Sequence, residues 1–97
     1  MDIKHDLAGQ QFIMTDSQQN KIGYIAYRVE SNGNLSALSV HVSSQWQGQG
    51  AAGKLLNSLV EYARTHGLKI FPVCPYVVKK FEQDPLRYAD VIGGRSS

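Results

Sequence analysis

The residues best suited to chemistry form a glycine-rich run, Gln47-Gly48-Gln49-Gly50-Ala51-Ala52, between a strand-like segment and a strongly amphipathic one. This pattern predicts a turn that leads directly into a helix. Backbone N–H groups at a helix start have no intrahelical partner, and the helix dipole places about half a positive charge there. Glycine also lets an anion approach the backbone without a Cβ in the way. The run therefore predicts a phosphate-binding loop.

Two common phosphate-binding patterns fit this run only in part. Gly48, Gly50 and Gly53 match a dinucleotide fingerprint, but the acidic residue expected about 20 positions later is missing, since that stretch holds Cys74. A P-loop needs Ser or Thr where this chain has Leu55, and an apolar side chain cannot ligate Mg²⁺. Both patterns also require a larger parallel sheet than one domain of this size offers.

The motif Gln47-x-x-Gly50-x-Ala52 resembles the coenzyme A pyrophosphate motif of the GNAT acetyltransferase superfamily, written Gln/Arg-x-x-Gly-x-Gly/Ala. The chain also resembles one small GNAT subfamily of minimal, single-domain N-acetyltransferase-like proteins, in order over residues 22–92. The matching segments are Gly48-Gln49-Gly50, Ala63-Arg64, Gly67-Leu68-Lys69-Ile70, Cys74-Pro75-Tyr76-Val77 and Tyr88-Ala89-Asp90-Val91. The resemblance implies an abbreviated GNAT acyl-CoA N-acyltransferase fold of the α+β (α/β) class. Its sheet would be mixed and mostly antiparallel, with a central helix after the Gly-rich loop and a short C-terminal helix.

The hydrophobic pattern independently predicts elements in a similar order. Alternating residues predict antiparallel strands over 11–15, 22–30 and 35–42, the last with Leu38, Val40 and Val42 on one face. Apolar residues at helical spacing then predict a long helix over 50–66.

The end of the chain predicts a second, shorter pair of elements. Gly67 should stop the long helix, and residues 68–73 suit a strand parallel to an earlier one. Pro72 predicts that the outer edge of this strand is unpaired, and residues 76–83 suit a short helix.

Length and composition predict one domain over 1–92 and a flexible tail over 93–97. The net charge of +2 gives no excess of cations for a nucleic-acid backbone. No apolar stretch has signal-peptide or membrane-spanning length, so we expect a cytoplasmic protein without membrane partners, as a monomer or homodimer. One cysteine and three scattered histidines predict no metal site.

The resemblance implies acetyl-CoA as cosubstrate. Its pyrophosphate would bind the backbone of the glycine-rich run, in which Gln47 replaces the commoner arginine, and its pantetheine arm would pair with the preceding strand. The residues expected to bind the cofactor are thus Val40, His41, Val42, Gln47, Gly48, Gln49, Gly50, Ala51 and Ala52.

Three residues are candidates for catalysis. Cys74 matches a subfamily cysteine regarded as acting on the acyl group or protonating the leaving coenzyme A, although a free cysteine is often only a small buried hydrophobe. Tyr76 could protonate the thiolate, as tyrosines near this position do in many larger GNAT enzymes, or simply pack. His41 could accept a proton from the incoming ammonium, although the subfamily tends to carry its histidine where this chain has Ser39.

We therefore expect an N-acetyltransferase that acts on an unidentified amine, either a small molecule or a protein. Family members of ordinary size carry helices between their first two strands, and those helices help to build the acceptor site. Only residues 16–21 occupy that place here, so the acceptor side should be open or completed by another subunit. The missing helices and Ser39 favour one alternative, a non-catalytic acyl-CoA sensor or protein-interaction module.

Overall fold

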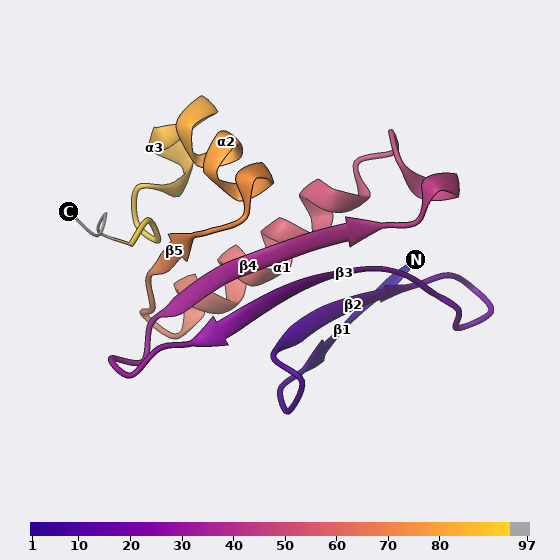
Figure 1. Cartoon of the computed structure of the whole chain (residues 1–97), viewed down its shortest axis with the longest axis horizontal. Helices are drawn as coiled ribbons and strands as arrows, with labels where there is room; N and C mark the ends of the chain where they lie inside the picture. Colours follow the sequence, from indigo (N-terminus) through magenta and orange to yellow (C-terminus); the bar gives the residue numbers. More distant parts are fainter. Residues whose placement is uncertain (94–97) are drawn as a thin grey trace.

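Five strands form a single sheet whose spatial order follows the chain, with the longest helix packed across one face (Figure 1). The computed structural model describes residues 1–93. Its elements are β1 (Asp2–Asp6), β2 (Gln11–Thr15), β3 (Lys21–Val29), β4 (Leu35–Val42), the 3₁₀ helix η1 (Ser44–Trp46), α1 (Ala51–Thr65), β5 (Ile70–Pro72), α2 (Pro75–Gln83) and α3 (Pro85–Tyr88). Strands β1 to β4 pair antiparallel, and β5 lies parallel to β4. The mixed, mostly antiparallel sheet expected from the sequence is confirmed.

Helix α1 holds the sheet through its apolar face. Leu55, Leu56 and Leu59 are essentially inaccessible to solvent and pack with Met14 and Ile25 of the sheet in one core cluster. Burial of each such side chain contributes about 1.5–3 kcal/mol. The expected stop at Gly67 is confirmed, since Gly67 has φ +67° just after the helix.

Strand β1 was not expected from the sequence. Its charged residues alternate with Ile3 and His5, and His5 occupies a core-facing position where an apolar residue would be typical. The imidazole stacks on Phe12 with ring centres 4.0 Å apart, and its Nε2 lies 2.6 Å from the hydroxyl of Tyr27. The core-facing position is thus filled by a histidine with aromatic and hydroxyl partners, so the strand lacks the apolar alternation that would predict it from the sequence.

A β-bulge interrupts β4 at Leu38. Ala26 pairs with Ser39 while Tyr27 pairs with Ala37, which leaves Leu38 without a partner in β3. The bulge breaks the regular alternation that would have placed Leu38 on one face with the valines that follow it.

The outer edge of β5 is closed in part by the end of the described chain. The Ile70 N–H donates to the carbonyl of Val91, and the Gly93 N–H donates to the carbonyl of Ile70. The strand expected over 68–73 covers only Ile70–Pro72 in the structure, so Pro72 lies at its end. Helix α3 was not expected from the sequence. Gly93, included in the expected tail, is buried, whereas 94–97 lie outside the described residues.

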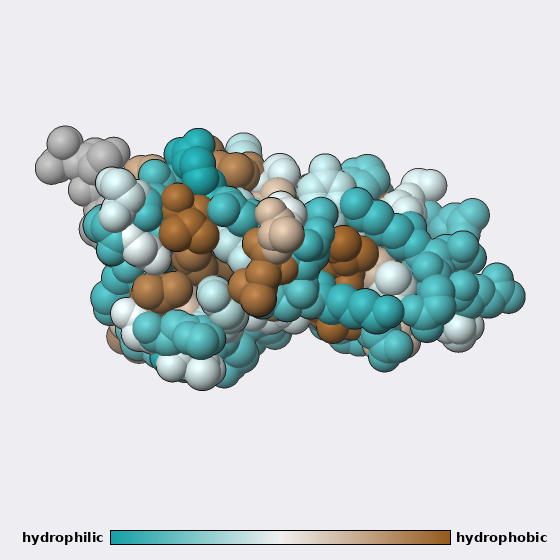
Figure 2. All heavy atoms as spheres, turned by 90° about the horizontal axis from the view of Figure 1, so that it is seen from below, coloured by the Kyte–Doolittle hydropathy of each residue, from teal (hydrophilic) through white to brown (hydrophobic). Residues whose placement is uncertain are grey.

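The surface of the described residues carries few large apolar side chains. The most exposed are Met1, Leu7, Val29, Val73 and Leu86, from separate parts of the chain. Figure 2 shows hydrophobic groups interspersed with hydrophilic ones on the side seen from below. Within 1–93, no helix is long and apolar enough to cross a membrane.

Gly23 lies where β3 meets both β4 and α1, and substituting it tests this close packing. A Cβ at this position would lie 2.8 Å from the carbonyl oxygen of His41 and 3.4 Å from Cδ1 of Leu55. Because the nearest atom belongs to the backbone, we expect Gly23→Ala to lower the free energy of unfolding by about 1–3 kcal/mol in chemical denaturation.

Gly53→Ala provides the matched control, since a Cβ there meets only the Tyr76 hydroxyl, at 3.8 Å. Alanine favours a helix over glycine by about 1 kcal/mol, so this variant should be neutral or stabilised. Equal unfolding free energies for wild type and Gly23→Ala would contradict the packing described here.

Candidate functional site

The glycine-rich loop, residues 47–50, connects η1 to α1 and is exposed to solvent. Gly48 and Gly50 have φ +80° and +79°, the left-handed region that favours glycine. A Cβ on either residue would meet no atom within 4 Å, so their conformation rather than crowding explains the glycines. Gly50 is the N-cap of α1, and no side chain caps the helix.

The backbone N–H groups of residues 48–53 are free. None of the six donates to a carbonyl or a side chain within residues 1–93, and the first N–H of α1 that does so belongs to Lys54, which bonds to Gly50. These donors gather where the dipole of a 15-residue helix is positive. Free N–H groups at a helix start suit the binding of an anion. Gly53 extends the expected set, because the third residue of a helix also lacks a backbone acceptor.

A hollow of about 230 Å³ opens at this loop. It is lined by Val42, Trp46, Gln47, Gly48, Gly50, Ala51, Ala52, Gly53 and Tyr76. The Gln47 side chain donates from Nε2 to the Val42 carbonyl at 2.9 Å and so ties the loop to the end of β4. Trp46 packs against the core. The structure therefore joins the expected loop residues, except Gln49, with Val42 and Tyr76 in one depression.

Strands β4 and β5 part beside this hollow. They pair only over Leu35–Ala37 and Ile70–Pro72, and the N–H groups of Val73 and Cys74 then both donate to the Ala37 carbonyl, at 3.1 and 2.9 Å. Beyond Ala37, β4 continues to Val42 without β5 at its side. This part of the β4 edge has no strand paired on the β5 side.

The bulge decides which backbone groups of β4 face that opening. The Ser43 N–H donates to Ile22 in β3, and in an antiparallel ladder alternate residues bond to the same neighbour. His41 therefore turns its backbone groups toward β3, whereas Val40 and Val42 turn theirs outward. Of the three β4 residues expected to bind the cofactor, Val40 and Val42 thus turn their backbone groups toward the unpaired edge, and His41 turns its groups toward β3.

Cys74 is buried, with 7% of its surface exposed, and belongs to the core cluster. It is the N-cap of α2, and its carbonyl accepts the Val78 N–H at 2.9 Å. The thiol therefore lies beneath the start of α2 rather than on an open surface.

Tyr76 lines the hollow from the first turn of α2. The side chain is half-buried, and this burial, with Tyr88 and Cys74 nearby, raises the pKa of its phenol above the ordinary value. The phenol therefore keeps its proton at neutral pH.

The imidazole of His41 lies apart from Tyr76. It is exposed on the sheet face away from α1, where its ring centre is 5.7 Å from that of Tyr24. The three expected catalytic side chains thus divide into Cys74 and Tyr76 at the α2 start, and His41 on the open face.

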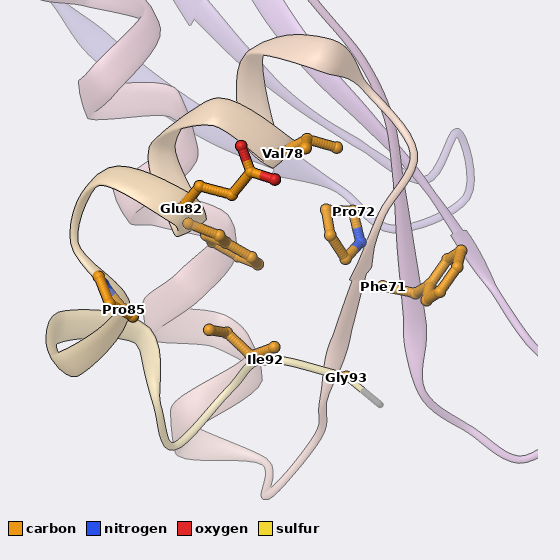
Figure 3. A pocket seen from close by; sticks show the side chains of 8 residues that line it. Phe71, Pro72, Val78, Glu82, Pro85, Ile92 and Gly93 are labelled. Carbon is orange, nitrogen blue, oxygen red and sulfur yellow. The ribbon is translucent and has the colours of Figure 1, made fainter. Parts of the chain in front are cut away.

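A larger hollow, of about 460 Å³, lies between β5 and the α2–α3 pair (Figure 3). Its lining is apolar except for Glu82 and shares no residue with the glycine-rich loop. A diphosphate needs N–H donors or cations, so we place the candidate site at the loop despite its smaller volume. Among residues 1–93, no group of three or more His, Cys, Asp or Glu side chains could hold a metal ion.

The Tyr76 phenol provides a direct test of this environment. Because burial disfavours the phenolate, we expect its pKa to exceed the ordinary value of 10.0. A ¹³C NMR titration of ring-labelled tyrosine would measure it, with Tyr76→Phe identifying the resonance and circular dichroism verifying that the fold persists. Equal midpoints in the folded and urea-unfolded protein would show that the phenol is fully solvated.

Comparisons with known proteins agree with this geometry. A model of the GCN5-related N-acetyl-transferase family matches residues 11–91. A GCN5-like candidate N-acetyltransferase from Staphylococcus aureus is 32% identical, with a TM-score of 0.75 over 96% of this chain and 88% of its own. No curated protein matches the chain.

Larger structures share the fold at lower identity. A GNAT family N-acetyltransferase from Escherichia coli, in complex with CoA, is 20% identical, with a TM-score of 0.63 over 73% of this chain and 43% of its own. An acetyltransferase of the GNAT family from Staphylococcus aureus is 14% identical, with a TM-score of 0.64 over 84% of this chain and 55% of its own. The chain thus spans about half of these two proteins, and the abbreviated fold implied by its sequence is confirmed. On the family match and the 32% identical relative, the chain belongs to the GCN5-related N-acetyltransferase (GNAT) family and forms a minimal GNAT domain.

Proposed function

We propose that this domain binds acetyl-CoA and transfers its acetyl group to an amine. The observation that carries the proposal is the set of free N–H groups over residues 48–53, at the positive end of α1. A diphosphate would accept charge-assisted hydrogen bonds from them, each worth about 1.5–3 kcal/mol where solvent is excluded and less at this exposed loop. Membership of an acetyltransferase family supports coenzyme A as the diphosphate.

The position of β4 supports a path for the rest of the coenzyme. The outward backbone groups of Val40 and Val42 suit the amides of a pantetheine arm, which can pair like a neighbouring strand. The Val42 carbonyl already accepts the Gln47 side chain, so Val40 offers the freer pair of groups. An arm along this edge would lead from the loop toward Ala37, where β5 ends and α2 begins.

The residues at the start of α2 suit the proton transfers of acyl transfer. A bound thioester supplies an acyl carbon that a neutral amine can attack and a thiolate that must leave. Tyr76 holds a proton at neutral pH and faces the hollow, so we assign it as the donor to the thiolate. Cys74 has a structural role at the start of α2, where its carbonyl accepts the Val78 N–H. His41, on the open sheet face, is the candidate acceptor for the proton that the amine releases.

The amine acceptor would approach from the side that family members of ordinary size cover with helices. In the structure the first two strands are β1 and β2 rather than the pair expected from the sequence, and they are joined by the short turn 7–10, in which the Asp6 carboxylate accepts the Gly9 N–H at 3.0 Å. The sheet face that carries Tyr24 and His41 therefore lies open. Such a face suits an amine carried on a protein as well as a small molecule.

Substituting Gly50 tests coenzyme binding. We expect Gly50→Asp to abolish the binding of acetyl-CoA in calorimetry, because a carboxylate would lie beside the diphosphate. Gly50→Asn is the matched control, since asparagine has nearly the same shape, tolerates the left-handed conformation and carries no charge. It should bind more weakly than wild type but measurably. Unchanged affinity in Gly50→Asp would exclude the loop as the diphosphate site.

Turnover distinguishes an enzyme from a sensor. We expect Tyr76→Phe to lower kcat by about a hundredfold with little change in acetyl-CoA affinity, as the loss of a general acid does. Cys74→Ala should retain most of the turnover. The reverse pattern would assign the donor role to the thiol.

The assay would follow release of free coenzyme A with a broad panel of amines, including peptides with a free N-terminus or a lysine. If wild type binds acetyl-CoA but releases coenzyme A no faster than buffer with every amine, the domain acts as a sensor or interaction module. The short β1–β2 turn, which leaves the acceptor side without helices, is the feature that favours this alternative.

A further inference from the structure

Two lysines stand beside the candidate site on one face of α2. Tyr76, Lys79, Lys80 and Gln83 are spaced by three, four and seven positions, so they share a helix face. A hollow of about 240 Å³ lies along this face and is lined by these four residues. Tyr76 also lines the hollow at the glycine-rich loop, so the two hollows adjoin. Its hydroxyl lies 3.8 Å from the position of a Cβ on Gly53, which brings this face to the first turn of α1.

The charges of Lys79 and Lys80 are not neutralised within residues 1–93. Neither ammonium takes part in an ion pair or a side-chain hydrogen bond there, and the Lys80 ammonium lies 5.7 Å from the centre of the Tyr76 ring. The nearest acidic residue in the helix, Glu82, lines the separate hollow shown in Figure 3. This face is therefore cationic and adjoins the anion site.

We propose that Lys79 and Lys80 bind the 3′-phosphate on the adenosine end of coenzyme A and so select the coenzyme over its dephospho form. The inference rests on the proposed function, which places the diphosphate at the loop. The adenosine end must then extend beyond the loop, and the face of α2 that carries Lys79 and Lys80 is a cationic surface that adjoins the loop. A phosphate monoester carries a charge of about −1.5 to −2 and accepts several hydrogen bonds, which suits a pair of ammonium groups.

A simpler role for these lysines is to complement the negative end of the α2 dipole. That role would affect stability, but it would not alter the relative affinity for two ligands that differ by one phosphate. The ratio of the affinities for coenzyme A and dephospho-coenzyme A is therefore the informative measurement.

Calorimetry of the full chain with these two ligands tests the proposal. We expect wild type to bind coenzyme A about tenfold more tightly than dephospho-coenzyme A. In Lys79→Gln/Lys80→Gln the ratio should approach one through weaker binding of coenzyme A, with the affinity for dephospho-coenzyme A unchanged. Lys4→Gln makes a charge change of the same sign on β1, where Lys4 donates to Gln19, and should keep the wild-type ratio.

The outcomes separate this inference from the proposed function. Equal binding of the two ligands by wild type, or a double variant that keeps the wild-type ratio, would overturn the role of the lysines and leave the loop site intact. If wild type bound neither ligand, the proposed function itself would fail. Raising the ionic strength should reduce the wild-type ratio, because the contacts lie at the surface.

Discussion

The unpaired edge of β4 beside the candidate site depends on a single carbonyl. The oxygen of Ala37 accepts the N–H groups of both Val73 and Cys74, and these bonds end the pairing of β4 with β5. A regular parallel pair would continue along β4 and cover its edge. Here the chain turns away into α2, while the bulge at Leu38 directs the backbone groups of Val40 and Val42 toward the space left open. The separation of the two strands, the unpaired β4 edge and the position of Tyr76 all follow from this local geometry.

Much of the fold could be predicted because local signals agree with it. The apolar residues at helical spacing in α1 and the glycines at both its ends lie in one continuous segment of the sequence. The structure confirms the helix and its end at Gly67. The position of the candidate anion site follows from the same stretch, since any helix start has free N–H groups. The order of the antiparallel strands was predictable for the same reason, as short turns join neighbours in the sheet.

Other features depend on contacts between distant residues, and no local pattern reports them. Strand β1 was missed because His5 finds its partners, Phe12 and Tyr27, on other strands. The bulge at Leu38 exists only in the register between β3 and β4. His41 was grouped with its neighbours for the same reason, since only the register shows that its backbone faces β3. The role of Cys74 likewise depends on the residues around its thiol. Its burial results from packing in the assembled core, which no local sequence pattern reports.

Helix α1 serves two parts of the molecule at once. Its apolar face forms the centre of the core, and its first turn supplies donors of the candidate anion site. A ligand held at that turn would bind only when the helix lies on the sheet, so occupancy would act on the folding equilibrium of the whole domain. In so small a chain, the cellular supply of the coenzyme would then also govern how long the protein survives proteolysis.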